Sequence, residues 1–110
     1  MLATAEQLDE EGFDVEVIDA RWLAPFDWDT VCDSVARTGR CLIVHEANVT
    51  GGFGAEVAAG VGERCFHSLD APVRRVGSPD LRMPAAPALQ AAVVPGVSRI
   101  ADQLRQCCEE

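Results

Sequence analysis

The stretch CLIVHE, residues 41–46, decides the fold class of this chain. Its first four residues form a continuous apolar run, and His45 and Glu46 follow at the C-terminal end of that run. An unbroken apolar run of this length is typical of a strand that other elements cover on both faces. We therefore expect residues 41–44 to form the central strand of a parallel sheet.

Helical and strand patterns alternate on both sides of this run. Alternation at the start of residues 14–19 places Val15 and Val17 on one face, and Ile18 makes the end apolar on both faces, which predicts a half-buried or edge strand. The apolar residues within 73–76 predict another strand. Apolar residues recur at helical spacing in four further segments. The predicted helices comprise residues 2–11, a segment from the Asp27 N-cap to Gly39, a segment from the 50–54 turn to Cys65, and residues 97–108.

The segment from Ser78 to Pro95 shows little periodicity and carries four prolines. Because proline interrupts both helices and sheets, this segment is predicted to be mostly loop, with one short helical turn near Leu89.

Strands that alternate with helices imply right-handed crossovers and a parallel sheet between two helix layers. The predicted fold class is therefore α/β, with three α/β/α layers and a mostly parallel sheet. Three predicted strands are few, since sheets average about five or six strands. A helix at the N-terminus with no strand before it suggests that part of the sheet is missing.

Length and charge limit the function classes. With 110 residues the chain has the size of one domain, and 9 Arg against 18 Asp and Glu give 9 − 18 = −9. This negative charge repels phosphate backbones and anionic lipid, so no nucleic-acid or membrane partner is expected. No apolar run approaches the roughly 20 residues of a membrane span. Five cysteines cannot all pair with one another and no signal peptide precedes them, so a reducing, cytoplasmic location is expected.

The strongest candidate site is His45 together with the glycine-rich turn TGGFG, residues 50–54. Ligands of parallel sheets bind at the carboxyl ends of strands, and helix N-termini offer free N–H groups to anions. The turn does not match G-x-G-x-x-G, and no Lys is present for a phosphate loop. The alternative is that the glycines only permit a tight turn and close packing. The candidate anion or interface residues are Thr50, Gly51, Gly52 and Gly54.

His45 is a weak candidate for a general base. Adjacent strand residues point to opposite faces, so His45 and Glu46 are not expected to act as a dyad. No other catalytic residue is expected.

The remaining cysteines and histidines give weaker signals. Cys41, His45, Cys65 and His67 would make a zinc site of unusual spacing, because Cys-x-x-Cys pairs are absent, and no metal site is expected. Cys107 and Cys108 precede two glutamates, which would raise the thiol pKa values and oppose a redox role.

Four strings in fixed order carry a family resemblance, supported by the proline-rich stretch that includes Pro79, Pro84 and Pro87 and by the PGV entry to the last helix. The strings are VEVIDARWLAPFD (15–27), VHEA (44–47), TGGFGAE (50–56) and PVRRVG (72–77). On these residues the chain resembles the transketolase C-terminal domain family, in particular the C-terminal domain of the β subunit of thiamine-diphosphate-dependent 2-oxo acid dehydrogenases.

The resemblance implies a transketolase C-terminal-like domain over residues 1–110 that lacks the first two strands of the family. It implies that thiamine diphosphate and Mg²⁺ bind elsewhere in the parent enzyme, so that this fragment binds no cofactor and is inactive alone. The implied partners are the α subunit, a second β subunit and the acyltransferase core. An unpaired sheet edge also predicts self-association of the fragment through residues 14–19.

Two function hypotheses remain at this point. The first is a non-catalytic assembly domain of a dehydrogenase that decarboxylates a 2-oxo acid and passes the acyl group to lipoamide. The second is a small stand-alone α/β protein that binds an anionic ligand at the turn from Thr50 to Gly54.

Overall fold

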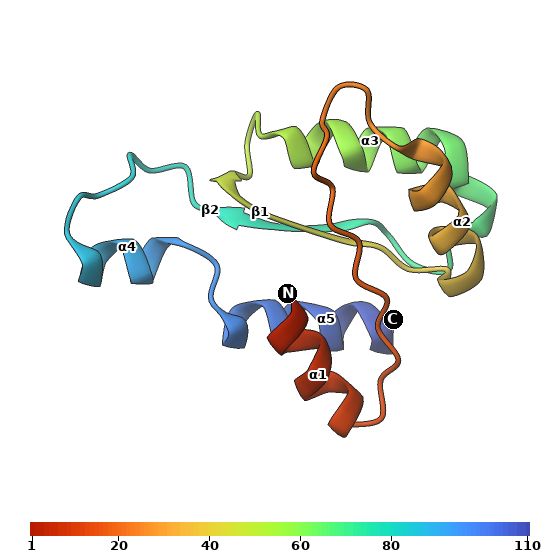
Figure 1. The fold of residues 1–110 in the computed structure, drawn as a ribbon, viewed down its shortest axis with the longest axis horizontal. Coiled ribbons are helices and arrows are strands. Elements are labelled where there is room, and N and C mark those ends of the chain that lie inside the picture. Colours follow the sequence, from red (N-terminus) through yellow and green to blue (C-terminus); the bar gives the residue numbers. More distant parts are fainter.

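The computed structural model describes residues 1–110 as two parallel strands between two layers of helices (Figure 1). The elements in chain order are α1 (Leu2–Glu10), α2 (Trp28–Thr38), β1 (Leu42–Asn48), α3 (Phe53–Cys65), the short 3-10 helix η1 (Phe66–Ser68), β2 (Arg74–Ser78), α4 (Pro87–Val93) and α5 (Val97–Glu109).

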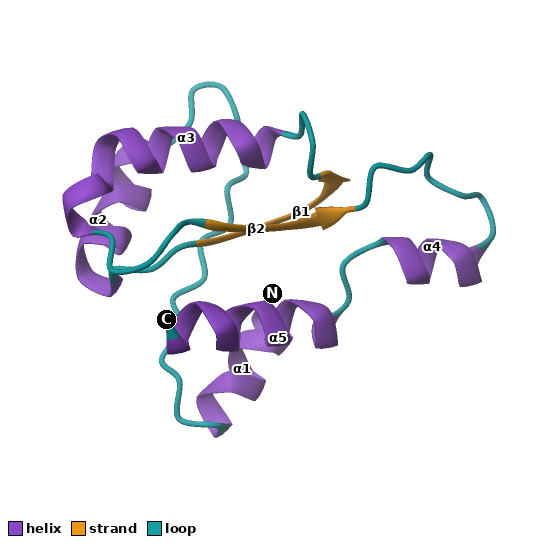
Figure 2. Cartoon of the chain, turned by 180° about the vertical axis from the view of Figure 1, so that it is seen from behind, coloured by secondary structure: helices purple, strands orange, loops and turns teal.

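The sheet is parallel, with Leu42 opposite Arg74 and Val44 opposite Val76. Helices α2 and α3 lie on one side of the strands, whereas α1 and α5 lie on the other (Figure 2). The predicted three-layer α/β/α arrangement is therefore confirmed. None of the helices combines the length and the apolar character that a membrane span requires.

The predicted strand over residues 14–19 is wrong. The segment is extended and Phe13, Val15 and Val17 are half-buried in alternation, as expected. However, no backbone N–H of residues 14–20 donates to another backbone group. A strand exists only where a neighbouring strand pairs with it, and the sheet consists of β1 and β2 alone. The alternating pattern produces an extended segment, but no strand lies beside it to pair with.

Two other elements differ from the prediction in extent. β1 continues beyond the apolar run through His45 and Glu46 to Asn48, because its pairing with β2 resumes at Ser78 after an irregularity. The single turn expected near Leu89 is the two-turn helix α4, which begins with Pro87 at its first position, where proline is well tolerated.

Two apolar clusters hold the layers together. One lies between α2 and α3, with Val31 and Val61 among its buried members, and Trp28 and Ile43 pack against it. The other joins α1, β2 and α5 through Leu8, Val76, Ile100 and Leu104. Each cluster covers one face of the small sheet, which explains why β1 can be apolar on both faces.

The ends of α2 follow the sequence prediction. The Asp27 carboxylate accepts a hydrogen bond from the Thr30 backbone N–H at 3.2 Å and another from the Thr30 hydroxyl, which lowers the pKa of Asp27. Gly39 ends the helix with φ of 72°, a left-handed conformation that favours glycine.

Glu16 ties the unpaired 14–19 segment to α2. Its carboxylate accepts a hydrogen bond from Ser34 Oγ at 2.8 Å and another from Arg37 Nη2 at 2.6 Å. These hydrogen bonds lower the pKa of Glu16 below its ordinary value of 4.5, the Ser34 bond having the larger effect.

A lowered pKa in the folded state makes a pH-dependent contribution to stability. The contribution of Glu16 is present in full above pH 4.5 and is lost as the pH falls from there through the folded-state pKa. We expect Glu16→Gln to be less stable than the wild type at pH 7 and the difference to shrink below pH 4.5. Urea unfolding of both proteins between pH 3 and 7 measures it. A difference independent of pH would contradict the assignment.

Candidate functional site

His45 lies on β1, and its imidazole ring packs against three glycines from the surrounding segments. A Cβ atom added to Gly54 would lie 2.6 Å from His45 Cδ2, and one added to Gly77 would lie 2.8 Å from His45 Cε1. A Cβ at Gly52 would lie 3.0 Å from the same Cε1 atom. The glycines of the turn and of β2 therefore make room for the histidine ring.

The hydrogen bonding of the ring limits its chemistry. His45 Nδ1 lies 3.0 Å from the Ala47 carbonyl oxygen, so Nδ1 is the protonated nitrogen that donates. His45 Nε2 is buried without a hydrogen-bond partner. In this arrangement Nε2 faces Gly52 and Gly54 of the turn and is closed off from solvent. Glu46 is exposed, as expected for its opposite orientation.

The polar groups of the turn are held by β2 and the residues that follow it. Thr50 donates to the Asp80 carboxylate from its backbone N–H at 3.3 Å and from its hydroxyl at 2.6 Å. Arg75 Nη1 donates to the Val49 carbonyl at 2.8 Å. An external anion would have to compete with the Asp80 carboxylate for Thr50. Anion binding at Thr50, Gly51, Gly52 and Gly54 stays a prediction, and these contacts give the turn a structural role.

The cysteines and histidines considered for zinc do not converge. No three His, Cys, Asp or Glu side chains lie close enough together to hold a metal ion. Burial raises the pKa of the Cys41 thiol to about 11, and burial is also the main reason why the pKa values of Cys107 and Cys108 are raised. His67 packs instead against Phe66, with ring centroids 5.4 Å apart.

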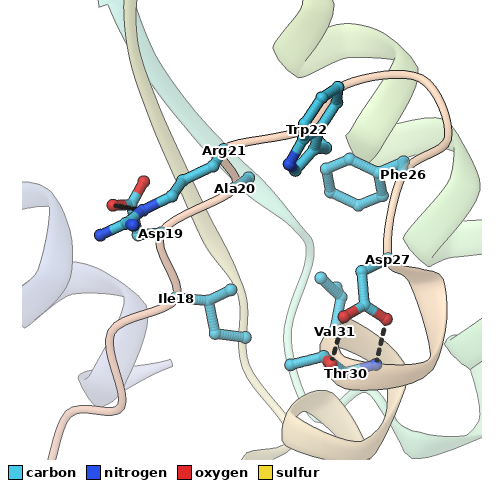
Figure 3. Close-up of a pocket in the computed structure, with 9 residues that line it drawn as sticks. All are labelled: Ile18, Asp19, Ala20, Arg21, Trp22, Phe26, Asp27, Thr30 and Val31. Carbon is cyan, nitrogen blue, oxygen red and sulfur yellow. Dashed lines mark hydrogen bonds and ion pairs between the residues drawn. The ribbon is translucent and has the colours of Figure 1, made fainter.

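A groove that the sequence analysis did not identify lies between the extended segment and α2 (Figure 3). Trp22 and Phe26 form part of its wall, and Trp22 is 75% exposed while the adjacent Leu23 is 51% exposed. Phe26 is held in place by Trp28, with ring centroids 4.7 Å apart. The concentration of large apolar residues in the connector at residues 22–26 was the available signal. The groove is lined by Ile18, Asp19, Ala20, Arg21, Trp22, Phe26, Asp27, Thr30 and Val31.

Comparison with known proteins places these features in a family context. Residues 1–100 match the family "Transketolase, C-terminal domain". The chain is 46% identical over 101 residues to the 2-oxoisovalerate dehydrogenase subunit beta of Pseudomonas aeruginosa. This match covers 92% of this chain and 28% of that protein. It is 47% identical over 83 residues to the pyruvate dehydrogenase E1 component subunit beta of Staphylococcus epidermidis, covering 76% of this chain and 26% of the relative.

A third relative is the 3-methyl-2-oxobutanoate dehydrogenase subunit beta of Mycobacterium tuberculosis, which is 43% identical over 99 residues. That match covers 90% of this chain and 28% of the relative. The chain thus spans about a quarter of the length of the curated relatives that it matches.

Proposed function

This chain belongs to the transketolase C-terminal domain family, and from that premise we propose that it is the C-terminal assembly portion of the β subunit of a 2-oxo acid dehydrogenase. The observation that carries the proposal is its 43–47% identity to β subunits whose names specify 2-oxo acid and pyruvate dehydrogenases. In the parent enzyme, thiamine diphosphate supplies the carbanion chemistry that decarboxylates the 2-oxo acid before the acyl group passes to lipoamide.

The residues of this chain do not fit a thiamine diphosphate and Mg²⁺ site. Mg²⁺ beside a diphosphate is usually bound by one or two carboxylates together with water and phosphate oxygens, and Asp80, the carboxylate at the turn, already accepts two hydrogen bonds from Thr50. The turn at Thr50 is held by the Asp80 carboxylate, which would repel a diphosphate. We therefore assign the cofactor to the remainder of the parent enzyme and regard residues 1–110 as inactive alone.

Exposed apolar surface supports an assembly role. Trp22 lines the groove and is 75% exposed, and the adjacent Leu23 is 51% exposed. Neighbouring exposed apolar side chains of this size offer a contact surface to another chain. The partners in this proposal are the α subunit and a second β subunit.

Unpaired backbone gives a separate reason for association. β1 pairs with β2 on one edge only, and the backbone N–H groups of residues 14–20 have no backbone partner. Free strand edges of this kind pair readily with another chain. We propose that the isolated chain self-associates through the 14–19 segment and that the intact β subunit pairs these groups.

The acidic face of α1 suits a contact with the acyltransferase core. Glu6, Asp9 and Glu10 are exposed and take part in no ion pair within the chain. A basic binding domain of the core would be attracted to this face, because complementary charge increases the rate of association.

A chimaeric β subunit tests the assembly role. The matching C-terminal part of the Pseudomonas aeruginosa 2-oxoisovalerate dehydrogenase subunit beta is replaced by this chain and expressed with the α subunit of that enzyme. We expect the chimaera to purify with the α subunit, whereas a β subunit that ends before the replaced part does not. The isolated chain, measured by sedimentation at rising concentration, should form dimers or larger species. A folded chimaera that leaves the α subunit unbound would refute the assembly role.

A further inference from the structure

Residues 79–94, which connect β2 to α5 and include α4, form an arm that projects from the body of the protein (Figure 1). Most side chains of the arm are exposed, and Leu81, Met83 and Leu89 are the large apolar ones among them. No residue of α4 belongs to either apolar cluster. The arm is therefore an apolar segment that its own chain leaves uncovered, and such a surface marks a site of contact with another protein.

The arm carries a proline-rich sequence, RMPAAP at residues 82–87. Pro84 and Pro87 are one repeat of the polyproline II helix apart, since that helix repeats every three residues. Ala86 has φ of −70° and ψ of 130°, close to the values of that helix. Arg82 is exposed and takes part in no ion pair within the chain. Proline-rich segments of this kind bind in grooves that aromatic side chains line.

The groove at Trp22 has aromatic walls (Figure 3). Two adjoining hollows share Trp22, Phe26 and Asp27 as lining residues. Pro25 completes one hollow, and the other continues along residues 18–21. Two hollows on one aromatic wall are suited to two prolines that lie one polyproline II turn apart.

We propose that the arm of one copy of this chain binds in the Trp22 groove of a second copy, with Pro84 and Pro87 in the two hollows. The two surfaces do not meet within one chain. In both views the arm lies beyond the C-terminal ends of the strands, away from the connector at residues 20–26 (Figures 1 and 2). Two copies can exchange their arms and close a two-fold pair with two identical contacts.

Charge complementarity favours a second copy as the partner. The chain has a net charge of −9, so two copies repel one another over most of their surfaces. Arg82 is the one cation of the arm, and Asp80, its one anion, already accepts two hydrogen bonds from Thr50. In the groove, Asp19 accepts from Arg21 Nε through Oδ2 at 3.0 Å, which leaves Oδ1 for Arg82. The arm is thus the part of one copy that the carboxylates of the groove attract.

This contact rests on the self-association proposed above and deepens it. The contact through the 14–19 segment uses backbone groups, whereas the arm contact uses side chains of the arm and of the groove. Either contact can therefore fail without the other.

Photocrosslinking of the 110-residue chain tests the arm contact. p-Benzoylphenylalanine is placed at the position of Met83, chains of natural isotope content are mixed with chains labelled with heavy nitrogen, and the mixture is irradiated. Cleavage at Arg places Met83 in peptide 83–99 and Trp22 in peptide 22–37. We expect these two peptides to be joined, with one from a light chain and the other from a heavy chain.

The other outcomes separate this contact from the earlier proposals. Associated chains whose crosslinks from the arm miss the groove would overturn the arm contact and leave the contact through residues 14–19 in place. A chain that stays monomeric in sedimentation at every concentration would overturn both contacts, while the chimaera decides the assembly role separately. Crosslinks from the arm to the α subunit of the chimaera, with none between β subunits, would overturn the second copy as the partner.

Trp22→Ala should raise the concentration at which half of the chains associate by at least about tenfold, because a central aromatic residue carries much of the binding energy of a contact. Phe66→Ala is the matched control, since Phe66 is a similarly exposed aromatic residue on η1, outside the groove. It should change that concentration by less than about twofold. Circular dichroism verifies that both variants are folded. Equal effects of the two substitutions would overturn the proposal.

A charge exchange tests the pairing of Arg82 with Asp19. Arg82→Glu and Asp19→Arg should each weaken association by about threefold, as expected for an exposed ion pair. A mixture of the two variants should associate within about twofold of the wild type, because a mixed pair again brings opposite charges together at both contacts. Arg99→Glu makes the same charge change on α5, outside residues 82–87, and is the control. A mixture that associates no more tightly than either variant alone would overturn the arm contact.

Discussion

Leu8→Ala is expected to lower the free energy of unfolding by about 3 kcal/mol, within the range measured for fully buried leucines. Leu8 is completely buried in the cluster that joins α1 to α5 and β2. Removing its side chain leaves a cavity that Val76, Ile100 and Leu104 cannot all fill without moving their helices or strand. Urea unfolding followed by circular dichroism measures the change.

Leu2→Ala is the matched control for this variant. Leu2 belongs to the same helix but is 71% exposed, so its replacement should change stability by no more than about 0.5 kcal/mol. Similar small effects at both positions would mean that α1 does not pack on α5. The ion pair between Arg105 of α5 and Glu11, the residue that follows α1, would then remain, and exposed pairs contribute little.

Gly60→Ala should cost about 2 kcal/mol, although alanine favours helices over glycine by up to about 1 kcal/mol. A Cβ atom at Gly60 would lie 2.5 Å from Trp28 Cζ3 and 2.7 Å from Trp28 Cζ2. The indole cannot move away freely, because Phe26 packs against its edge and the Arg64 guanidinium lies 4.1 Å from its ring centroid.

Gly62 in the same helix provides the comparison. A Cβ atom at Gly62 would meet nothing within 4 Å, so Gly62→Ala should stabilise the protein by up to about 1 kcal/mol. The two variants have the same change in composition and differ only in the contact with Trp28. Equal effects of the two substitutions would show that α2 and α3 are not packed as described.

Local sequence signals predicted the helices well because their ends depend on neighbouring residues. The Asp27 side chain caps α2, and Gly39 ends the helix because glycine readily adopts the left-handed conformation. The alternation at residues 14–19 correctly predicted an extended segment. Pairing, in contrast, depends on a second strand that no local pattern can supply. The same limit explains why the continuation of β1 to Asn48 was not predicted, since Ser78 provides the pairing there.

The candidate site, too, could be predicted from the sequence only in part. The sequence identified His45 and the glycine turn as related features, and the structure brings them into contact. The reason for the glycines, however, is the space that the His45 ring occupies. Asp80 accepts from Thr50 although it lies 30 positions away along the chain, so spacing alone could not reveal this contact. Whether Trp22 is exposed also depends on how elements distant in the sequence pack, so the sequence alone could not predict its exposure.

The claim that this chain is the assembly portion of a β subunit is tested most directly by measuring the oxidation of 3-methyl-2-oxobutanoate by the chimaeric dehydrogenase described above. The assay contains thiamine diphosphate, Mg²⁺, the acyltransferase core and an enzyme that reoxidises dihydrolipoamide with NAD. If this chain is the assembly portion of a β subunit, the chimaera should restore at least about a tenth of the parent activity. The reason is that weakening the association of the subunits by about 1 kcal/mol changes the assembled fraction by less than tenfold. A β subunit without this portion should be inactive. A chimaera that folds and binds the α subunit but shows no more activity than the shortened β subunit would contradict the account.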